Sequence, residues 1–238
     1  FRTNRRSPLI QTGSDTALLV SYWEKADQPE RLAAQVGRKE LTFRWGEEKD
    51  VSRGSLLRAF PNVLIEPRRA VDLFHEAESR RHLLDETVFH VEHRFVDVWR
   101  RFSRALSQRN AALSKNQLAL STWDDTFVEQ SHELDGLRRQ VFEKFQAGFT
   151  DLVAELSDSI PLNIQIHYRP GWKESIGLVE HLKSVRESEV RMGFSMAGPQ
   201  RADIRIEDNS GVLAVEKLSR GQQLSLIHIS EPTRPLYI

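Results

Sequence analysis

The segment Leu218-Ser219-Arg220-Gly221-Gln222 has residue types and a spacing suited to binding a phosphate group. A serine and a glycine at a strand-to-helix junction present backbone N–H groups to an anion. The Ser219 hydroxyl can donate to a phosphate oxygen, and Gly221 lets the backbone approach closely because it lacks a Cβ. A polar loop that caps a helix has the same composition, so these five residues alone leave both interpretations open.

The patterns around this segment predict a mixed α/β chain with a long helical insertion. Residues 15–23, 31–36 and 41–45 have the short apolar runs and the alternation of an antiparallel meander. From Glu78 onward apolar residues recur at helical spacing and predict two long helices joined as an antiparallel hairpin. Those that mark the two helices are Phe95, Val98, Trp99, Phe102, Leu106, Leu113 and then Phe127, Leu134, Leu137, Val141, Phe145, Leu152, Leu156.

Strands and one further helix are predicted on both sides of this hairpin. The third helix is marked by apolar residues from Ile176 to Val185. The turn sequence Asp208-Asn209-Ser210-Gly211 predicts a hairpin between the last two strands. The predicted strands are Asn62–Ile65, Leu162–Tyr168, Val190–Met196, Ala202–Glu207 and Val212–Glu216.

Composition limits the chemistry open to the chain. The 238 residues include no cysteine, which excludes disulfides, thiolate zinc sites and cysteine catalysis. Lys+Arg and Asp+Glu both number 34, so the formal net charge is zero and a polycation that coats nucleic acid is excluded. No run of 18 apolar residues occurs, so we expect no membrane span and a cytoplasmic location.

Several charged or aromatic groups have two interpretations each. Glu86, His90 and His93 either share a helix face that binds a metal or, as we favour, are solvated helix residues. Trp99 and Phe102 lie on the apolar stripe and are predicted to be core residues. Basic side chains on the first long helix either contact DNA phosphates or form a solvated face; they are Arg100, Arg101, Arg104 and Arg109, with a second cluster at Arg2, Arg5 and Arg6.

An ordered set of short motifs supports the phosphate-binding interpretation of residues 218–222. They are Leu64-Ile65-Glu66-Pro67, Arg80-Arg81-His82-Leu83-Leu84-Asp85, Gln108-Arg109-Asn110-Ala111-Ala112-Leu113, Arg169-Pro170-Gly171-Trp172 and Gly198-Pro199-Gln200-Arg201-Ala202-Asp203. Together with Leu218–Gln222, which resembles the LSxGQ signature of ATP-binding-cassette ATPases, this order resembles the RecF family of bacterial recombination mediators. Arg68 and Gln200 depart from that family's pattern.

The resemblance implies a fold and a domain order. We expect an α/β fold in which a partial ABC-type ATPase head, without its P-loop strand, carries an inserted helical arm. The head would occupy 1–85 and 159–223, and the arm 86–158. Residues 224–238 change character abruptly and are expected to be a non-native tail.

The resemblance also implies a function. Proteins of the RecF family bind ATP and Mg²⁺, dimerise on DNA at single-strand/double-strand junctions, and act with RecR and RecO to load RecA during repair, replication and the SOS response. Leu218, Ser219, Arg220, Gly221 and Gln222 would meet ATP held by the other protomer, with Ser219 on the γ-phosphate.

The sequence lacks the rest of an ATPase site. The 238 residues contain no GxxxxGK[ST]. Leu83-Leu84-Asp85-Glu86 resembles a Walker B motif only by its letters, because it precedes the signature and is expected to open a helix. We therefore expect no catalytic residue and no ATP hydrolysis from these residues alone.

Two alternatives stay open at this point. The chain could be the head of another SMC-type ATPase, although its arm is short for a long coiled coil. It could also be a stand-alone helical-hairpin interaction module that binds no nucleotide.

Overall fold

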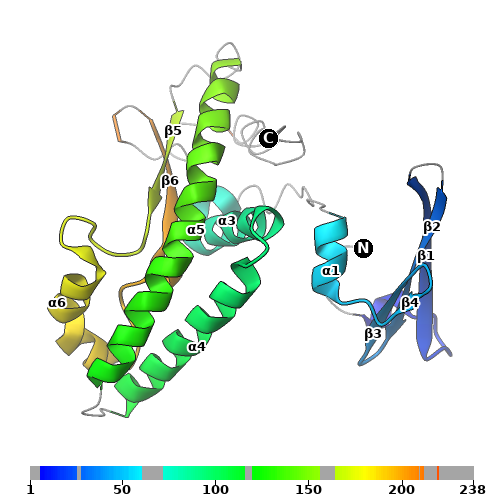
Figure 1. The fold of residues 1–238 in the computed structure, drawn as a ribbon, viewed down its shortest axis with the longest axis horizontal. Helices are drawn as coiled ribbons and strands as arrows, with labels where there is room; N and C mark the ends of the chain where they lie inside the picture. Colours follow the sequence, from blue (N-terminus) through cyan, green and yellow to red (C-terminus); the bar gives the residue numbers. More distant parts are fainter. Residues whose placement is uncertain are drawn as a thin grey trace. The chain divides into compact units, whose positions relative to one another are not determined.

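The computed structural model describes residues 6–25, 28–60, 72–115, 120–155, 164–208, 210–211 and 219. The chain forms two compact units, Phe1–Asn62 and Val63–Ile238, called unit 1 and unit 2 here (Figure 1). The boundaries predicted from sequence at 85, 158 and 223 fall inside unit 2, where the arm helices pack with the strands that follow them.

Unit 1 is an antiparallel sheet of four strands in the order β1-β2-β3-β4, preceded by a short 3-10 helix. The predicted meander is therefore correct. In the register, Tyr22 of β1 lies opposite Arg31 of β2, and Ala33 of β2 lies opposite Arg44 of β3. The elements are η1 Ser7–Leu9, β1 Thr16–Lys25, β2 Gln28–Gly37, β3 Leu41–Trp45 and β4 Glu48–Lys49.

A short helix, α1, Arg53–Ala59, follows the sheet and leads into the residue that packs on one of its faces. Ser52 caps the helix, because its hydroxyl accepts the N–H three residues further on at 3.0 Å. Phe60, directly after the helix, contacts two indoles of the sheet, with ring centroids 4.7 Å from Trp23 and 5.1 Å from Trp45. Edge-on and tilted aromatic contacts of this kind add stability beyond the area that they bury.

Unit 2 contains the predicted hairpin of long helices, α4 and α5, packed with α3, α6 and a two-stranded antiparallel sheet of β5 and β6. Figure 1 shows α4 and α5 side by side, with β5 and β6 running beside α5. The elements are α3 Ala77–Val91, α4 Phe95–Ser114, α5 Leu120–Glu155, β5 Ile164–Arg169, α6 Gly177–Met192, η2 Pro199–Arg201 and β6 Asp203–Asp208.

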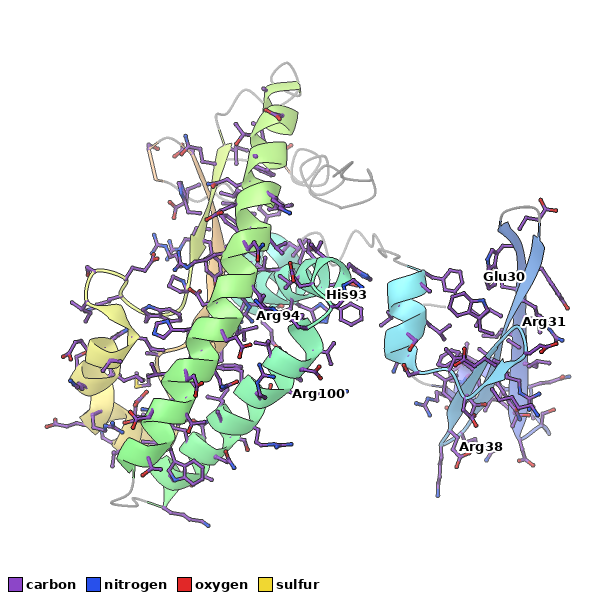
Figure 2. All side chains as sticks on the ribbon, viewed as in Figure 1. Glu30, Arg31, Arg38, His93, Arg94 and Arg100 are labelled. Atoms are coloured by element: carbon purple, nitrogen blue, oxygen red, sulfur yellow. The ribbon has the colours of Figure 1, made fainter. Side chains whose placement is uncertain are left out.

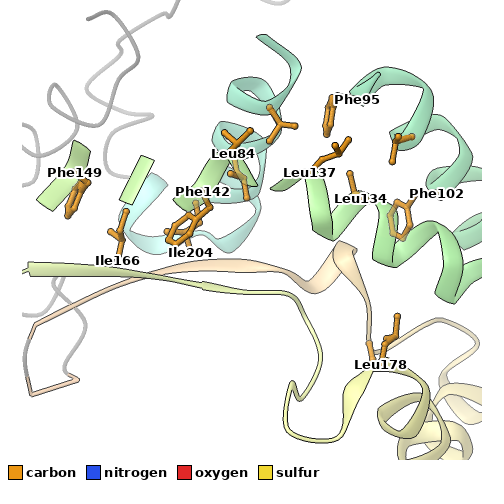
Figure 3. Packing of buried hydrophobic residues seen from close by; sticks show 14 of the residues in the cluster. Leu84, Phe95, Phe102, Leu134, Leu137, Phe142, Phe149, Ile166, Leu178 and Ile204 are labelled. Carbon is orange, nitrogen blue, oxygen red and sulfur yellow. The ribbon is translucent and has the colours of Figure 1, made fainter. Parts of the chain in front are cut away.

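The core of unit 2 lies between the helical hairpin and the β5–β6 pair (Figure 3). The positions of these core residues follow from the predicted periodicity. Residues three and four apart on a helix lie on one face of the helix, and every second residue of a strand lies on one face of the sheet. The buried members of the core on α4, α5 and the strands include Val98, Phe102, Leu134, Leu137, Val141, Phe142, Ile164, Ile166 and Ile204.

The structure corrects two predictions about local structure. Val190–Met196 is not a strand: α6 continues to Met192 and ends at Gly193, whose φ of 76° is the left-handed conformation of a helix C-cap. Trp99 is not a core residue, since 45% of its surface is exposed. Trp99 lies beside the buried stripe of α4, next to Val98, and the helical spacing of apolar residues did not separate the buried position from the exposed one.

Some predicted elements lie outside the described residues. These include the strands Asn62–Ile65 and Val212–Glu216 and the tail 224–238. Within the described part of the chain, no helix combines the length and apolar character needed to cross a membrane.

Candidate functional site

The predicted phosphate-binding segment is represented by one described residue. Ser219 is exposed, as a hydroxyl that meets a ligand must be. Leu218, Arg220, Gly221 and Gln222 lie outside the described residues. Leu64-Ile65-Glu66-Pro67 also lies outside the described residues. The structure does describe the four remaining motifs of the set, and these meet around one segment.

That segment is Gly198–Asp203, which enters β6, and a close backbone contact with Gly171 holds its start. Gly198 donates its N–H to the Gly171 carbonyl at 3.1 Å. Gly171 has a φ of +94°, and a Cβ there would lie 2.2 Å from the Gly198 oxygen. Gly198 has a φ of +128°, and its Cβ would meet the ring of Phe127 at 2.6 Å. Both positions therefore require glycine.

Two neighbouring arginines of α3 hold the other end of the segment. Arg80 forms a two-point ion pair with Asp203, at 2.7 and 3.0 Å, and also donates to the Leu73 carbonyl. Arg81 donates to the Ala202 carbonyl at 2.8 Å. Burial lowers the pKa of Arg81, against the opposing effect of the Asp203 carboxylate. The double arginine thus anchors the entry to β6 from a helix more than a hundred residues earlier in the chain.

Arg138 of α5 connects the same segment to α3. Its guanidinium is 3% exposed, pairs with both oxygens of Asp85 at 2.8 and 3.0 Å, and donates to the Pro199 carbonyl at 2.8 Å. Burial lowers its pKa, but the Asp85 carboxylate outweighs burial and the net pKa is raised. Asp85 lies in the middle of α3, so the expectation that it opens a helix is wrong.

Sequence reasoning missed Arg138, although its position was a usable signal. The residue falls at helical spacing among the apolar residues Leu134, Leu137 and Val141. A charged residue on a buried stripe requires a charged or hydrogen-bonding partner. Asp85 is that partner.

The structure contradicts a DNA contact for Arg109. This side chain is fully buried, and it donates to Glu189 at 2.6 Å, to Asp124 at 2.8 Å and to the Ser195 hydroxyl at 2.6 Å. Burial opposes its charge, but these hydrogen bonds and carboxylates raise its pKa. The basic stripe predicted from sequence groups Arg109 with Arg100, Arg101 and Arg104. Arg109 instead shares the buried face of Phe102 and Leu113 and pairs with Glu189 of α6.

Asn110, beside Arg109, holds the loop after α6. Its side-chain oxygen accepts both the Ser195 N–H, at 2.8 Å, and the Ser195 hydroxyl, at 2.7 Å. Gln200 donates to the Ala197 carbonyl at 2.9 Å. The residues from Ser195 to Asp203 are thus held by side chains of α3, α4, α5 and the segment itself. We call these residues, with their partners, the motif clamp.

Of the second predicted basic cluster, Arg2 and Arg5 lie outside the described residues, and Arg6 donates to the Lys39 carbonyl at 2.8 Å. The other cations predicted on the first long helix lie on the outer face of α4. Arg100 and Arg104 are exposed, and Figure 2 shows Arg100 projecting on the side away from α5. Arg100 has a weak contact with Asp97 at 3.7 Å. Arg101 is also exposed but pairs with Glu133 at 2.6 Å, which leaves it less available to a phosphate.

The three residues weighed as metal ligands do not form a site. Helix α3 ends at Val91, so His93 lies beyond the helix that carries Glu86 and His90. Glu86 instead lies 3.8 Å from His82. Across the described residues, no group of three or more potential ligands surrounds a common point.

The sequence matches RecF proteins along almost all of its length. The DNA replication and repair protein RecF of Chromohalobacter salexigens is 36% identical over 229 residues, covering 94% of this chain and 62% of the relative. This chain is a homologue of RecF. RecF of Pseudomonas aeruginosa is 35% identical over 231 residues, covering 94% of this chain and 61% of the relative. The chain therefore spans about three fifths of the RecF proteins that it matches.

The fold agrees with this relationship. The solved structure of the recombination mediator protein RecF with ATP in the RecFOR pathway matches with a TM-score of 0.78 at 19% identity, over 97% of this chain and 65% of that one. The predicted fold class, α/β with an inserted helical arm, is confirmed, since the chain has the fold of the solved RecF structures. No protein-family model matches the sequence.

Proposed function

We propose that this chain is part of a RecF-type protein that binds ATP, dimerises on it, and binds DNA at single-strand/double-strand junctions. In that role it would act in the cytoplasm with RecR and RecO to load RecA and support the SOS response, with slow ATP hydrolysis releasing the intact protein. The observation that carries the proposal is the 36% identity over 94% of the chain, joined to a motif clamp built from the shared motifs.

The ATP contact is proposed for Leu218, Ser219, Arg220, Gly221 and Gln222, facing a nucleotide held by a second copy. Ser219 would donate to the γ-phosphate, Gly221 would let the backbone pack on the nucleotide, and Gln222 would stabilise the loop. Mg²⁺ would accompany ATP through residues other than these. In support, Ser219 is exposed, and the clamp fixes the start of β6, the described strand nearest to it in sequence.

The DNA contact is proposed for Arg100 and Arg104, with Arg101 in a lesser role because of its pair with Glu133. Exposed guanidinium groups can bind backbone phosphates, each with two parallel hydrogen bonds. Arg109 is excluded from this set by its burial.

The ATP proposal is tested in a chimaera in which residues 6–223 replace the matching part of Pseudomonas aeruginosa RecF. Sedimentation with and without ATP measures dimerisation. We expect Ser219→Arg to abolish the ATP-dependent dimer, since the long side chain would fill the phosphate position, and Ser219→Thr to retain it. A Ser219→Arg chimaera that dimerises normally would favour the nucleotide-free interaction module.

The DNA proposal is tested with the same chimaera on a gapped duplex. Arg100→Glu/Arg104→Glu should weaken binding and reduce the salt dependence of the affinity. The matched control is Lys144→Glu/Arg191→Glu, at two exposed cations on α5 and α6, which makes the same change in net charge. Equal weakening by both pairs would show that only total charge matters and would refute a DNA contact on α4.

A further inference from the structure

The two faces of the unit 1 sheet differ in character. Side chains alternate between the faces of a strand. The face that carries Trp23 and Trp45 packs on Phe60, directly after α1, whereas the opposite face remains open among the described residues of the unit. Figure 2 shows the alternation directly, with the neighbouring Glu30 and Arg31 of β2 pointing to opposite sides of the sheet. Arg31 belongs to the open face.

A shallow groove of about 480 Å³ runs over this open face. Three exposed cations border it, and Glu47 is the one carboxylate among its lining residues. None of the three cations forms an ion pair with another described residue. The lining residues are Leu18, Arg31, Ala33, Gln35, Thr42, Arg44, Gly46, Glu47 and Lys49.

Two of these cations are placed where they repel each other. Arg44 of β3 and Lys49 of β4 are direct cross-strand partners. Like charges in that position destabilise a sheet, since the Cβ atoms of opposed residues lie only about 5 Å apart. A bound polyanion would relieve this repulsion, so the pair is better suited to binding phosphate than to stabilising the fold.

An aromatic platform continues the row of cations. Tyr22 on β1 lies opposite Arg31, and its side chain is 71% exposed. The Arg31 guanidinium carbon is 5.9 Å from the centre of the Tyr22 ring. Tyr22, Arg31, Arg44 and Lys49 thus form a diagonal row across all four strands, called the sheet row here.

We propose that the sheet row binds single-stranded nucleic acid, with phosphates on Arg31, Arg44 and Lys49 and a base stacked on Tyr22. Open sheet faces that combine cations with exposed aromatic rings suit unpaired strands, because each base offers a face for stacking while the backbone needs only positive charge. An acidic peptide would match the cations but would leave the Tyr22 platform unused. The inference rests on the DNA binding proposed above and adds a surface on the other unit.

The test uses the complete 238-residue chain and fluorescein-labelled oligothymidine, with anisotropy read over a series of salt concentrations. Arg44→Glu/Lys49→Glu should weaken binding about tenfold or more and reduce the salt slope by about 1.4, the value for two phosphate contacts on a single strand. Arg38→Glu/Lys39→Glu is the matched control: it lies in the β2–β3 turn, makes the same charge change, and should leave the slope unchanged.

A second variant isolates stacking. Tyr22→Ala should weaken single-strand binding about 5- to 150-fold, the range for loss of one stacked base, whereas Tyr22→Trp should retain it. Photocrosslinking of 5-iodouracil oligonucleotides, mapped by mass spectrometry, should mark Tyr22.

Several outcomes would overturn the proposal. They are equal losses in the turn control, no effect of Tyr22→Ala, or competition by polyglutamate as effective as that by oligothymidine. If Arg100→Glu/Arg104→Glu abolishes DNA binding while the sheet-row variants bind normally, the inference fails and the proposed function stands. Failure of the unaltered chain to bind oligothymidine at any salt concentration would refute the inference, whereas the proposed function is decided by DNA binding of the chimaera.

Discussion

Replacing Arg109 by leucine should lower the free energy of unfolding strongly, because the substitution leaves a buried carboxylate without its partner. Arg109 and Glu189 are both fully buried and joined at 2.6 Å. Among the described residues, removing the arginine leaves the buried Glu189 charge with a hydrogen bond from the Met196 N–H alone, at 2.8 Å. Breaking a buried pair in this way costs about 3–5 kcal/mol.

That cost converts to a large shift in melting temperature. For a unit of this size each kcal/mol shifts the transition by about 2–4 °C, so Arg109→Leu should lower it by about 6–20 °C. Differential scanning calorimetry of the complete chain measures the shift. The double variant Arg109→Leu/Glu189→Leu should recover most of it, because replacing both partners by apolar groups removes the stranded charge.

The control is Lys183→Ala on α6, which removes an ion pair of similar length whose two side chains are 65% and 59% exposed. Exposed pairs contribute little, so this variant should melt close to the unaltered chain. The reasoning is refuted if Arg109→Leu melts no lower than Lys183→Ala, or if the double variant is less stable than Arg109→Leu alone.

Three further predictions concern unit 2. Gly171→Ala should abolish folding of this unit by circular dichroism, because its Cβ would meet the Gly198 carbonyl at 2.2 Å; a native spectrum would contradict the clamp geometry. Asp85→Asn should destabilise the unit in urea by about 3–5 kcal/mol, because it leaves Arg138 charged and buried, and a change near zero would show that Arg138 reaches water. Burial lowers the pKa of His181, whose Nδ1 accepts the Lys173 N–H at 3.0 Å. The unfolded chain therefore binds more protons at this residue, and the stability of the unit should fall as the pH drops below about 6.5. An NMR titration that places the pKa of His181 above 6.5 would contradict this prediction.

The long helices and the meander were predictable because their signals are strong and local. Twenty residues with apolar positions at helical spacing define α4 whatever surrounds it. The end of α6 was not predictable from Val190–Met196, since a short apolar run fits either a helix end or a strand. The Gly193 C-cap decides between them.

The site was predictable only in part, because partners far apart in sequence decide what a charged residue does. Arg109 lies seven residues after Phe102 and four before Leu113, on the buried stripe of α4, whereas Arg100, nine residues before Arg109, falls on the opposite face. The helical spacing could therefore have separated Arg109 from Arg100, but it does not reveal that Glu189, eighty residues later, is the partner of Arg109. The motifs that marked the family turned out to be largely structural, and in the described residues they form the motif clamp rather than touching a ligand.

The most direct test of the account asks whether Ser219 meets ATP. The chain has no cysteine, so Ser219→Cys introduces a single thiol into residues 6–223 of the chimaera, with the cysteines of the remaining part replaced. The rate of alkylation is measured with and without ATP, and Ser107→Cys, on the exposed side of α4, is the control. ATP should slow alkylation at 219 by about tenfold or more, as expected for a side chain enclosed in a nucleotide interface, and leave 107 unchanged. Equal rates at 219 with and without ATP, in a chimaera that binds ATP, would contradict the account.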